Sequence, residues 1–530
     1  MGYTANGLFG VLRDIHTDIT FVSKRGPILY TKIKGRRGYV MEEGPGGANR
    51  VVQYMADRLR NHAWGKEAAY DLKWFCKRED NYTVSRLDLP EDENVPDIDK
   101  YTLIRLDPNK LNYDKFSQYQ WEVRHNIGED VIIVPDKIKP DDIIDSESAL
   151  EYVARAVLNE QSWIQIMPVF FSHDYHNSTL NKVIKRLLEN SPDRNALFAH
   201  FEHTPLPSAK NFGLFDEVER YDGRKQTDVL LTASLVNDIY FLQTKANVQR
   251  YLDTVQTYIP KKEYTIQHKK INGVDFYVVR YRDHDTWVKA VPVSVDPEDL
   301  RKRASRTRVK NEARKARTNV DNDTIVVYST DRGGEETKGV AKKLSACNKF
   351  KQRHPGANVI VNQQYDPSRT EILRYQAELR RIEEEGKRGN DAFPGYITLD
   401  PEKYKQDRIL HRYRAFDVLL ITSIADGMNL VAKEGAVLAD LGRPTVIILS
   451  KDAGAAEQLG NAGAILTDSH DEESIIRALE YVVYKMTPEE RWNRAKALRK
   501  SVEKENMEDH TYNIFSSIAE RRNEKLASKK

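Results

Sequence analysis

Short apolar runs separated by polar loops and amphipathic stretches recur along most of the chain. The run Val418-Leu419-Leu420-Ile421 has the length and composition of a buried parallel strand. Further strands are expected at 19–22, 101–105, 131–134, 164–171, 196–201, 275–280, 288–291, 324–328, 357–361 and 445–450. Helices are expected at 149–160, 180–189, 472–485 and 488–503. We therefore expect an α/β fold.

The run at 418–421 leads into the most informative stretch of the chain. Asp426 and Gly427 stand where the chain turns, and residues 428–434 begin a helix. Such a strand–loop–helix directs backbone N–H groups and a positive dipole end toward a ligand above the sheet. Glu434 lies on the first turns of that helix, where a carboxylate can accept hydrogen bonds from sugar hydroxyls. An isolated Asp-Gly pair, however, is more often an ordinary βα connection.

Length and composition restrict the classes of protein. A chain of 530 residues exceeds one ordinary core, so we expect two domains. The net charge of +3, from 83 basic and 80 acidic residues, gives no global indication of a nucleic-acid or membrane partner. No apolar run approaches the roughly 20 residues of a membrane span, and no secretory signal is evident. Two distant cysteines, Cys76 and Cys347, favour a reducing compartment, and we expect a cytoplasmic protein.

The string Asp426–Glu434, DGMNLVAKE, resembles the donor-sugar loop of the trehalose-6-phosphate synthase family of retaining glycosyltransferases. Ordered similarities extend over roughly residues 19–515. The resemblance implies a GT-B fold, in which two Rossmann-like domains face a central cleft. It implies an acceptor domain at 1–297 and a nucleotide-sugar domain at 298–530 whose C-terminal helix crosses back. The donor-binding residues that it implies in this loop are Asp426, Gly427, Met428, Asn429, Leu430 and Glu434.

Two further segments resemble the family's donor-phosphate elements. Arg332 and Lys338 follow the strand at 324–328, and the family carries an Arg and a Lys here with one residue fewer between them. Arginine binds phosphate oxygens bidentately, whereas lysine acts as a point charge. Gly46 and Gly47, in a loop before a helical pattern, resemble the family's Gly-Gly loop over the donor phosphate.

The acceptor side is represented in both halves of the chain. Arg25 ends the string Ser-Lys-Arg after the first strand, and Arg369 ends a Pro-Ser-Arg string in the second half. By resemblance, these two arginines converge on the phosphate of the acceptor. Tyr113 and Trp121 match by position the aromatic pair that contacts the acceptor sugar. Glu122, directly after Trp121, departs from the family pattern.

Two histidine motifs about thirty residues apart complete the resemblance. His173-Asp174-Tyr175-His176 follows an apolar strand, and His203-Thr204-Pro205 follows the next one. Taken alone, such residues could bind a metal or lie in the core, but no further ligands at metal-site spacing are evident. The resemblance implies catalytic roles for Asp174, His203, Arg332 and Lys338, and it places Asp174 also at the acceptor.

The activity implied is transfer of glucose, with retention, from UDP-, GDP- or ADP-glucose to glucose 6-phosphate, without a metal or other cofactor. Neither a membrane nor a nucleic-acid partner is expected, and a homo-oligomer is compatible with the sequence. One alternative is a sibling transferase for another phosphorylated acceptor, such as glycerol 3-phosphate, an amino-sugar phosphate or a cyclitol phosphate. Another is a non-catalytic regulatory subunit, in which we expect Arg332, Lys338 or Glu434 to be lost; all three are present.

Residues 301–317, RKRASRTRVKNEARKAR, are strongly basic. A charge run of this kind is usually a solvated helix face, and contact with an acidic partner is the less common role. We therefore expect a solvated helix here.

Overall fold

The computed structural model describes most of the chain. The described residues are 19–23, 28–32, 39–43, 51–56, 72–77, 102–106, 114–131, 133–161, 163, 167–189, 191, 194–271, 273–331, 336–365, 380–381, 384, 397–401 and 406–528. They form two compact units. The N-terminal unit comprises Tyr3–Val291 with Thr511–Lys530, and the C-terminal unit is Pro292–His510. The chain therefore passes between the units at 291/292 and at 510/511, whereas the sequence suggested a boundary after residue 297.

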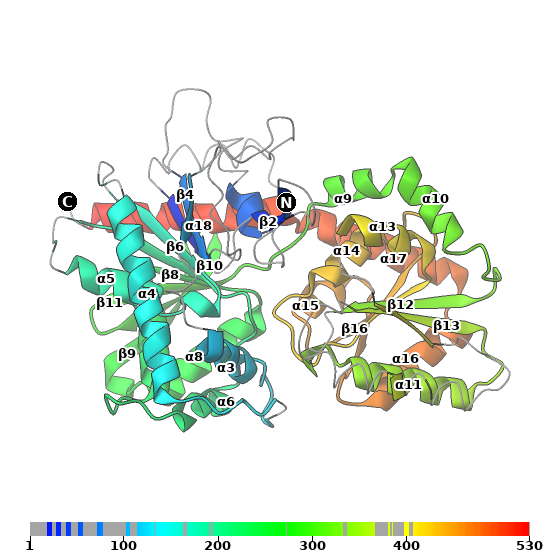
Figure 1. Ribbon diagram of the computed structural model, residues 1–530, viewed down its shortest axis with the longest axis horizontal. Coiled ribbons are helices and arrows are strands. Elements are labelled where there is room, and N and C mark those ends of the chain that lie inside the picture. Colours follow the sequence, from blue (N-terminus) through cyan, green and yellow to red (C-terminus); the bar gives the residue numbers. More distant parts are fainter. Residues whose placement is uncertain are drawn as a thin grey trace. The chain divides into compact units, whose positions relative to one another are not determined.

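A mixed sheet forms the centre of the N-terminal unit (Figure 1). Its strand order is β5-β4-β1-β6-β7-β8-β11-β10-β9. The first seven strands in that order are parallel, and β10 and β9 add an antiparallel edge. Their bounds are β1 Ile19–Ser23, β4 Leu72–Lys77, β5 Thr102–Leu106, β6 Val169–His173, β7 Leu197–Phe201, β8 Ile239–Leu242, β9 Tyr264–Ile271, β10 Val274–Tyr281 and β11 His284–Ala290. A separate hairpin pairs β2 Ile28–Lys32 with β3 Tyr39–Glu43.

Helices cover both faces of this sheet. On one face, the core joins Val22, Phe170 and Phe198 of the strands to α4 and α5, and continues to α3, α7 and α8. On the other face, Arg521 of α18 lies 5.2 Å from the ring centroid of Trp287, and Ser517 contacts Lys289. The helix bounds are α3 Asp114–Arg124, α4 Pro140–Glu160, α5 Leu180–Leu188, α6 Ala209–Phe212, α7 Gln226–Ser234, α8 Lys245–Tyr258 and α18 Met507–Ala527.

The C-terminal unit contains a fully parallel sheet with the order β14-β13-β12-β15-β16-β17. Helices α11 and α16 pack on one face through an aliphatic core, and α13, α14 and α17 cover the other (Figure 1). The strands are β12 Ile325–Asp331, β13 Val359–Tyr365, β14 Ile397–Pro401, β15 Val418–Ile421, β16 Val446–Ser450 and β17 Ile465–Thr467. The helices are α9 Pro297–Ala304, α10 Thr307–Lys315, α11 Val340–Arg353, α13 Gln406–Ala415, α14 Leu430–Leu438, α15 Ala456–Leu459, α16 Glu472–Glu480 and α17 Pro488–Lys504.

The prediction of a strand at 131–134 is wrong. The described residues of this segment form no strand, and the side chain of Val134 is 81% exposed. Its apolar run has strand composition, but it does not pair with the sheet. Conversely, β9 was not expected, because most of its side chains are exposed and polar at the antiparallel edge.

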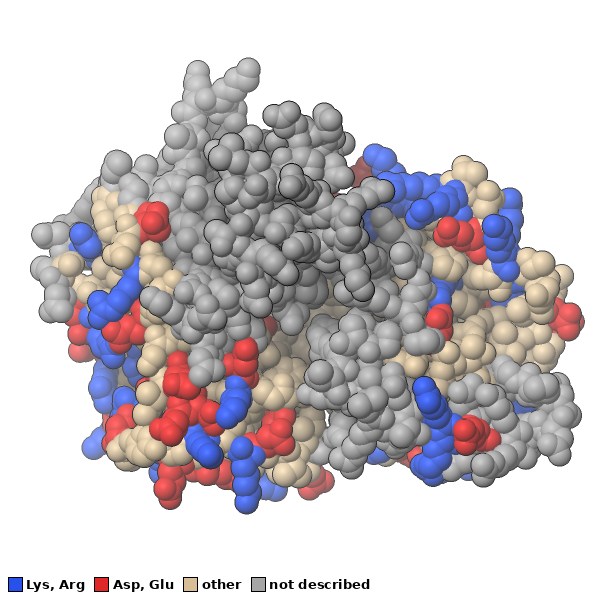
Figure 2. Space-filling view, viewed as in Figure 1, with Lys and Arg blue, Asp and Glu red and all other residues tan. Residues whose placement is uncertain are grey.

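The basic run forms α9, α10 and the turn that follows. Figure 2 shows the Lys and Arg side chains of this segment gathered at the surface. Arg303 and Arg308 pair within their own helices, with Asp299 and Glu312. Arg301 and Arg317 differ, because they form ion pairs with residues of other elements, at 2.7 Å with Asp440 and 2.8 Å with Asp417. The solvated face is thus confirmed for most of the run, while these two arginines anchor it to the unit.

Among the described residues, no helix has the length and hydrophobicity to cross a membrane.

Candidate functional site

The loop after β15 holds the predicted donor-sugar residues. Asn429 adopts a φ of 72° and caps α14, its Oδ1 accepting a hydrogen bond from the Ala432 N–H at 3.0 Å. A positive φ is costly for a non-glycine residue and tends to occur at functional positions. Asp174, another predicted site residue, is one of only two other described non-glycine residues with a positive φ. The backbone at both predicted positions is therefore held in an unusual conformation.

Lys338 lies against this loop. Its Nζ contacts Asp426 Oδ2 at 2.6 Å, and Asn429 Nδ2 donates to the same oxygen at 3.1 Å. The turn Glu336–Lys338 is fixed by the adjacent Gly339, which has a φ of 62°. A Cβ at Gly339 would lie 2.3 Å from the backbone oxygen of Thr422, so the turn packs on the β15 loop in a way that only glycine allows. The structure thus brings a predicted phosphate-binding cation and a predicted sugar-binding carboxylate together.

Glu434 is 1% exposed and lies on α14 as expected. Tyr413, on α13, donates its hydroxyl to Glu434 Oε2 at 3.1 Å. The sequence analysis missed Tyr413, because no local pattern connects it to a residue on the next helix. Of the donor loop, Gly427, Met428 and Leu430 are also described: Met428 N–H donates to Asp426 Oδ1 at 3.3 Å, and Leu430 begins α14.

We expect Tyr413→Phe to raise the KM for the donor about tenfold, because a hydrogen bond to a charged group contributes about 1.5–3 kcal/mol. The phenylalanine leaves the packing of α13 in place but no longer orients Glu434. Initial-rate kinetics with varied donor measure the effect, and Tyr484→Phe, at a side chain that is 54% exposed, is the matched control. An unchanged donor KM in Tyr413→Phe would contradict the orienting role.

A buried ion pair supports the end of β12, from which the chain enters the segment that carries Arg332. Lys343 Nζ contacts Asp331 Oδ2 at 2.6 Å, and the two side chains are 0% and 5% exposed. Gln363 Nε2 donates to the same carboxylate oxygen at 3.3 Å. Lys343 was also missed, since a lysine in a helical segment is usually solvated.

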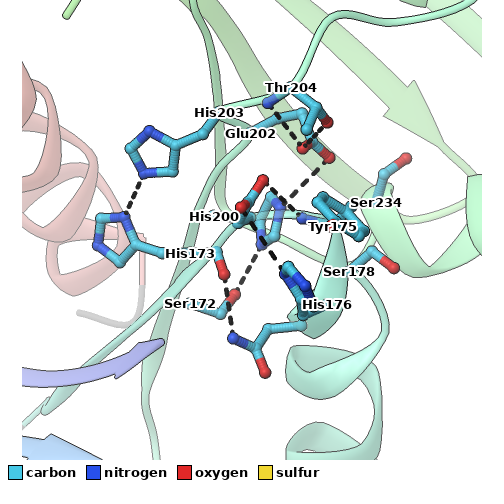
Figure 3. Close-up of polar contacts among 12 residues, drawn as sticks. Ser172, His173, Tyr175, His176, Ser178, His200, Glu202, His203, Thr204 and Ser234 are labelled. Atoms are coloured by element: carbon cyan, nitrogen blue, oxygen red, sulfur yellow. Dashed lines mark hydrogen bonds and ion pairs between the residues drawn. The ribbon is translucent and has the colours of Figure 1, made fainter. Parts of the chain in front are cut away.

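In the N-terminal unit, the two histidine motifs meet at the carboxyl ends of the neighbouring parallel strands β6 and β7. His173 Nδ1 and His203 Nε2 are 3.2 Å apart, and their rings are stacked (Figure 3). The Asp174 N–H donates to Phe201 O at 2.8 Å, and Asp174 Oδ1 accepts from the Tyr175 N–H at 3.1 Å. Each motif follows an apolar strand as expected, and the pairing of β6 with β7 places both motifs at one edge of the sheet.

The charges of Asp174 and His203 influence each other. Desolvation raises the pKa of Asp174 above its ordinary value, against the opposing effect of His203. Desolvation lowers the pKa of His203, while Asp174 and Glu202 act to raise it. Burial therefore disfavours the charged form of both groups, and the charge of each partly offsets this effect on the other.

Trp121 lies on α3, with its ring centroid 4.2 Å from that of His125. Helix α3 contacts the turn after Asp174, where Ser178 Oγ donates to Gln120 Oε1 at 3.2 Å. The predicted aromatic residue therefore belongs to a helix that packs beside the histidine motifs. The same helix ends at Arg124, whose ion pair with Glu202 the sequence analysis also missed.

The remaining predicted site residues lie outside the described residues. They are Arg25, Gly46, Gly47, Tyr113, Arg332 and Arg369.

Within the described ranges, one group of side chains has metal-ligand chemistry. It consists of Asp452, Asp468 and His470, one ligand atom of each lying within 4.8 Å of the others. Lys451 already contacts Asp468 at 2.7 Å, so a cation of the protein itself neutralises part of this group.

Comparison with known proteins identifies the family. The model of glycosyltransferase family 20 matches residues 152–520. An alpha,alpha-trehalose-phosphate synthase [UDP-forming] from Pichia angusta is 27% identical over 343 residues, which are 63% of this chain and 67% of that protein. The Candida albicans protein of the same name is 26% identical over 63% of this chain and 64% of its own length. The matches thus span about two thirds of these relatives.

Solved structures show the fold over nearly the whole chain. An E. coli structure bound with UDP-2-fluoro glucose has a TM-score of 0.69 and 18% identity, covering 95% of this chain and 99% of that chain. A Burkholderia xenovorans synthase in complex with glucose-6-phosphate has a TM-score of 0.70 and 19% identity, covering 94% and 98%. The N-terminal domain of a Candida albicans trehalose-6-phosphate phosphatase has a TM-score of 0.73 and 17% identity, covering 96% and 97%.

The fold expected from the sequence, α/β with two Rossmann-like domains of the GT-B type, is confirmed by these structures. The predicted relation to the trehalose-6-phosphate synthases is likewise confirmed. Because the family model matches most of the chain, this protein belongs to glycosyltransferase family 20.

Proposed function

We propose that the protein transfers glucose from UDP-glucose to glucose 6-phosphate and forms trehalose 6-phosphate with retention of configuration. The observation that carries this proposal is the intact donor loop of a family 20 chain, in which Lys338 contacts Asp426 at 2.6 Å beside the N-terminus of α14. The relatives in Pichia and Candida are named as UDP-forming enzymes, which favours uridine as the base. The Burkholderia complex with glucose-6-phosphate favours that acceptor.

In the donor subsite, we assign Lys338, together with Arg332, to the diphosphate. Cations fixed in place can stabilise the charge that develops on a departing phosphate, which is a role that metal ions fill in other transferases. Asp426 and Glu434 would accept hydrogen bonds from donor hydroxyls, and the positive end of α14 would face the donor. We accordingly propose that no metal is required, which is tested by measuring activity after treatment with EDTA.

For the acceptor, we assign Trp121 and Asp174 to the sugar and His203 to the reacting region, and by resemblance Tyr113 to the sugar and Arg25 and Arg369 to the phosphate. These assignments follow the family resemblance. The adjoining His173, Asp174 and His203 support them, because together they form a polar edge at the ends of β6 and β7.

The contacts of the two donor-loop carboxylates favour a mechanism in which the acceptor attacks the face of the sugar from which the nucleotide leaves. Asp426 is engaged by Lys338 and Asn429, and Glu434 by Tyr413, so neither is poised as a free nucleophile. The bond from C1 to the phosphate oxygen breaks while C1 bonds to the acceptor hydroxyl oxygen on the same face. The hydroxyl proton passes to the departing phosphate oxygen, so atoms and charge balance without a glycosyl-enzyme.

A nucleotide-release screen tests this function. UDP-, GDP- and ADP-glucose are each combined with glucose 6-phosphate, with glycerol 3-phosphate, with an amino-sugar or cyclitol phosphate, and with no acceptor. We expect the fastest release from UDP-glucose with glucose 6-phosphate, and an α,α-linked product by NMR. A faster rate with another acceptor would assign a sibling activity. Binding without nucleotide release in any combination would indicate a non-catalytic subunit, and an inverted product or a trapped covalent adduct would exclude transfer on one face.

A further inference from the structure

The N-terminal unit contains a buried ion pair directly beside its histidine motifs. Arg124, the last residue of α3, contacts Glu202 Oε2 at 2.7 Å, and the two side chains are 4% and 0% exposed. Glu202 follows the last residue of β7 and directly precedes His203. The pair therefore joins the helix that carries Trp121 to the strand end that carries His203.

Glu202 belongs to a larger buried polar network. Thr204 Oγ1 donates to Glu202 Oε1 at 2.7 Å, and His200 Nε2 lies 3.9 Å from Glu202 Oε2. His200 Nδ1 is in turn 2.8 Å from Ser172 Oγ (Figure 3). Burial by itself raises the pKa of Glu202, but Arg124, His200 and Thr204 lower it to about 2. Glu202 is thus a carboxylate that stays ionised inside the unit at neutral pH.

Such a pair is not needed for stability alone. Two buried charges lose their hydration, and apolar side chains of similar volume often stabilise a protein equally well. What the pair adds is an electrostatic connection between two elements. It lies between α3, which also contacts the turn after Asp174 through Gln120, and the loop that begins at His203.

We propose that Arg124 and Glu202 are positioning residues of the acceptor subsite, which hold the Trp121 helix and the His203 loop in one fixed arrangement. This inference rests on the proposed function, because it assigns the pair to that reaction. It goes further in naming two residues that do not contact the substrate and act through Trp121 and His203.

The pair also has an electrostatic effect that packing alone cannot produce. Among the described residues, His173 contacts His203, Asp174, Glu202 and His200 act on its pKa, and Arg124 pairs with Glu202. Desolvation and His200 lower the pKa of His203, and Asp174 and Glu202 raise it. Removal of the negative charge of Glu202 is therefore expected to lower the pKa of His203 further.

Three variants separate positioning from simple packing: Glu202→Gln, Arg124→Met and the double variant. Lys525→Met is the matched control. Lys525 contacts the buried Asp238 at 2.8 Å, and Asp238 also accepts from the Phe198 N–H near the start of β7, at the opposite end of that strand. The readouts are thermal stability, kinetics with varied acceptor and donor, and the pKa of His203 by NMR of ¹³C-labelled histidine, assigned with His203→Gln.

We expect each single variant to lose stability and the double variant to regain most of it, since no unpaired charge remains. We also expect the pKa of His203 to be lower than in the wild-type protein, both in Glu202→Gln and in the double variant. In both variants, kcat/KM for the acceptor should fall about 10- to 100-fold, because small misplacements at a reacting centre have effects of this size. The KM for the donor should stay unchanged, and Lys525→Met should change stability only.

A double variant that recovers wild-type kcat/KM and the wild-type His203 pKa together with stability would overturn the proposal, since the pair would then be structural. So would a changed His203 pKa with unchanged acceptor kinetics. If the wild-type protein transfers no glucose in the nucleotide-release screen, the proposed function fails. In that case, acceptor binding by calorimetry and the NMR titration still decide whether the pair positions this subsite.

Discussion

Lys338→Ala is expected to lower kcat about 10²–10³-fold, which is the size of effect seen when one preorganised group that stabilises developing charge is removed. The Lys338 ammonium contacts Asp426 at 2.6 Å, and the Lys338 side chain is 15% exposed. A donor diphosphate can therefore compete for this cation, while a donor hydroxyl takes the place of the ammonium at Asp426. The loss should appear in kcat because the phosphate gains charge as it departs.

Steady-state nucleotide release with saturating donor and acceptor measures this effect. Lys349→Ala, at an exposed lysine of α11 paired with Glu472, is the control for a change of net charge in the same unit. We expect Arg332→Ala to produce a loss similar to that of Lys338→Ala. A Lys338→Ala protein with unchanged kcat would show that the charge on the leaving group is stabilised elsewhere, and the proposed mechanism would have to be abandoned.

Asp417→Ala is expected to lower the free energy of unfolding by about 3 kcal/mol, because it leaves the partly buried Arg317 guanidinium and the buried Val326 N–H without their acceptor. Asp417 is 3% exposed, and its carboxylate accepts from Arg317 Nη1 at 2.8 Å, Arg443 Nε at 2.6 Å and the Val326 N–H at 2.9 Å. Removing this carboxylate therefore breaks contacts at the start of β12, at the end of the basic run and in the loop before β16.

Urea unfolding followed by circular dichroism measures this change. Asp323→Ala, at an exposed carboxylate in the loop before β12, should leave the midpoint close to that of the wild type. Equal midpoints for Asp417→Ala and Asp323→Ala would mean that the network around Asp417 contributes little. The expected result also explains why the basic run is not uniformly solvated, since Arg317 belongs to this network.

Local pattern predicted several of the buried strands and some of the helices. The strand at 418–421 has the predicted bounds, and β7 and β16 begin one residue later than expected and end as expected. These strands are buried on both faces, so their apolar runs are continuous and distinct from the neighbouring loops. The segment at 131–134 has the same composition without a strand partner, and there the pattern was misleading.

Part of the candidate site was also evident in the sequence. The Asp426–Glu434 string, Lys338, and the motifs containing Asp174 and His203 were assigned through their resemblance to the family, and each follows a predicted strand. Parallel strands end at one edge of a sheet, so motifs that follow adjacent strands lie close together. The contact between His173 and His203 follows from the pairing of β6 with β7.

The sequence by itself determined the candidate donor and acceptor residues, through their resemblance to the family, and many of the elements that they follow. Only the tertiary structure decided which side chains touch: Lys338 with Asp426, Tyr413 with Glu434, Lys343 with Asp331, and Arg124 with Glu202. Each pair joins residues on different elements, so its contact depends on strand order, register and the packing of one helix on another. Those are properties of the whole core, and no local run of residues specifies them.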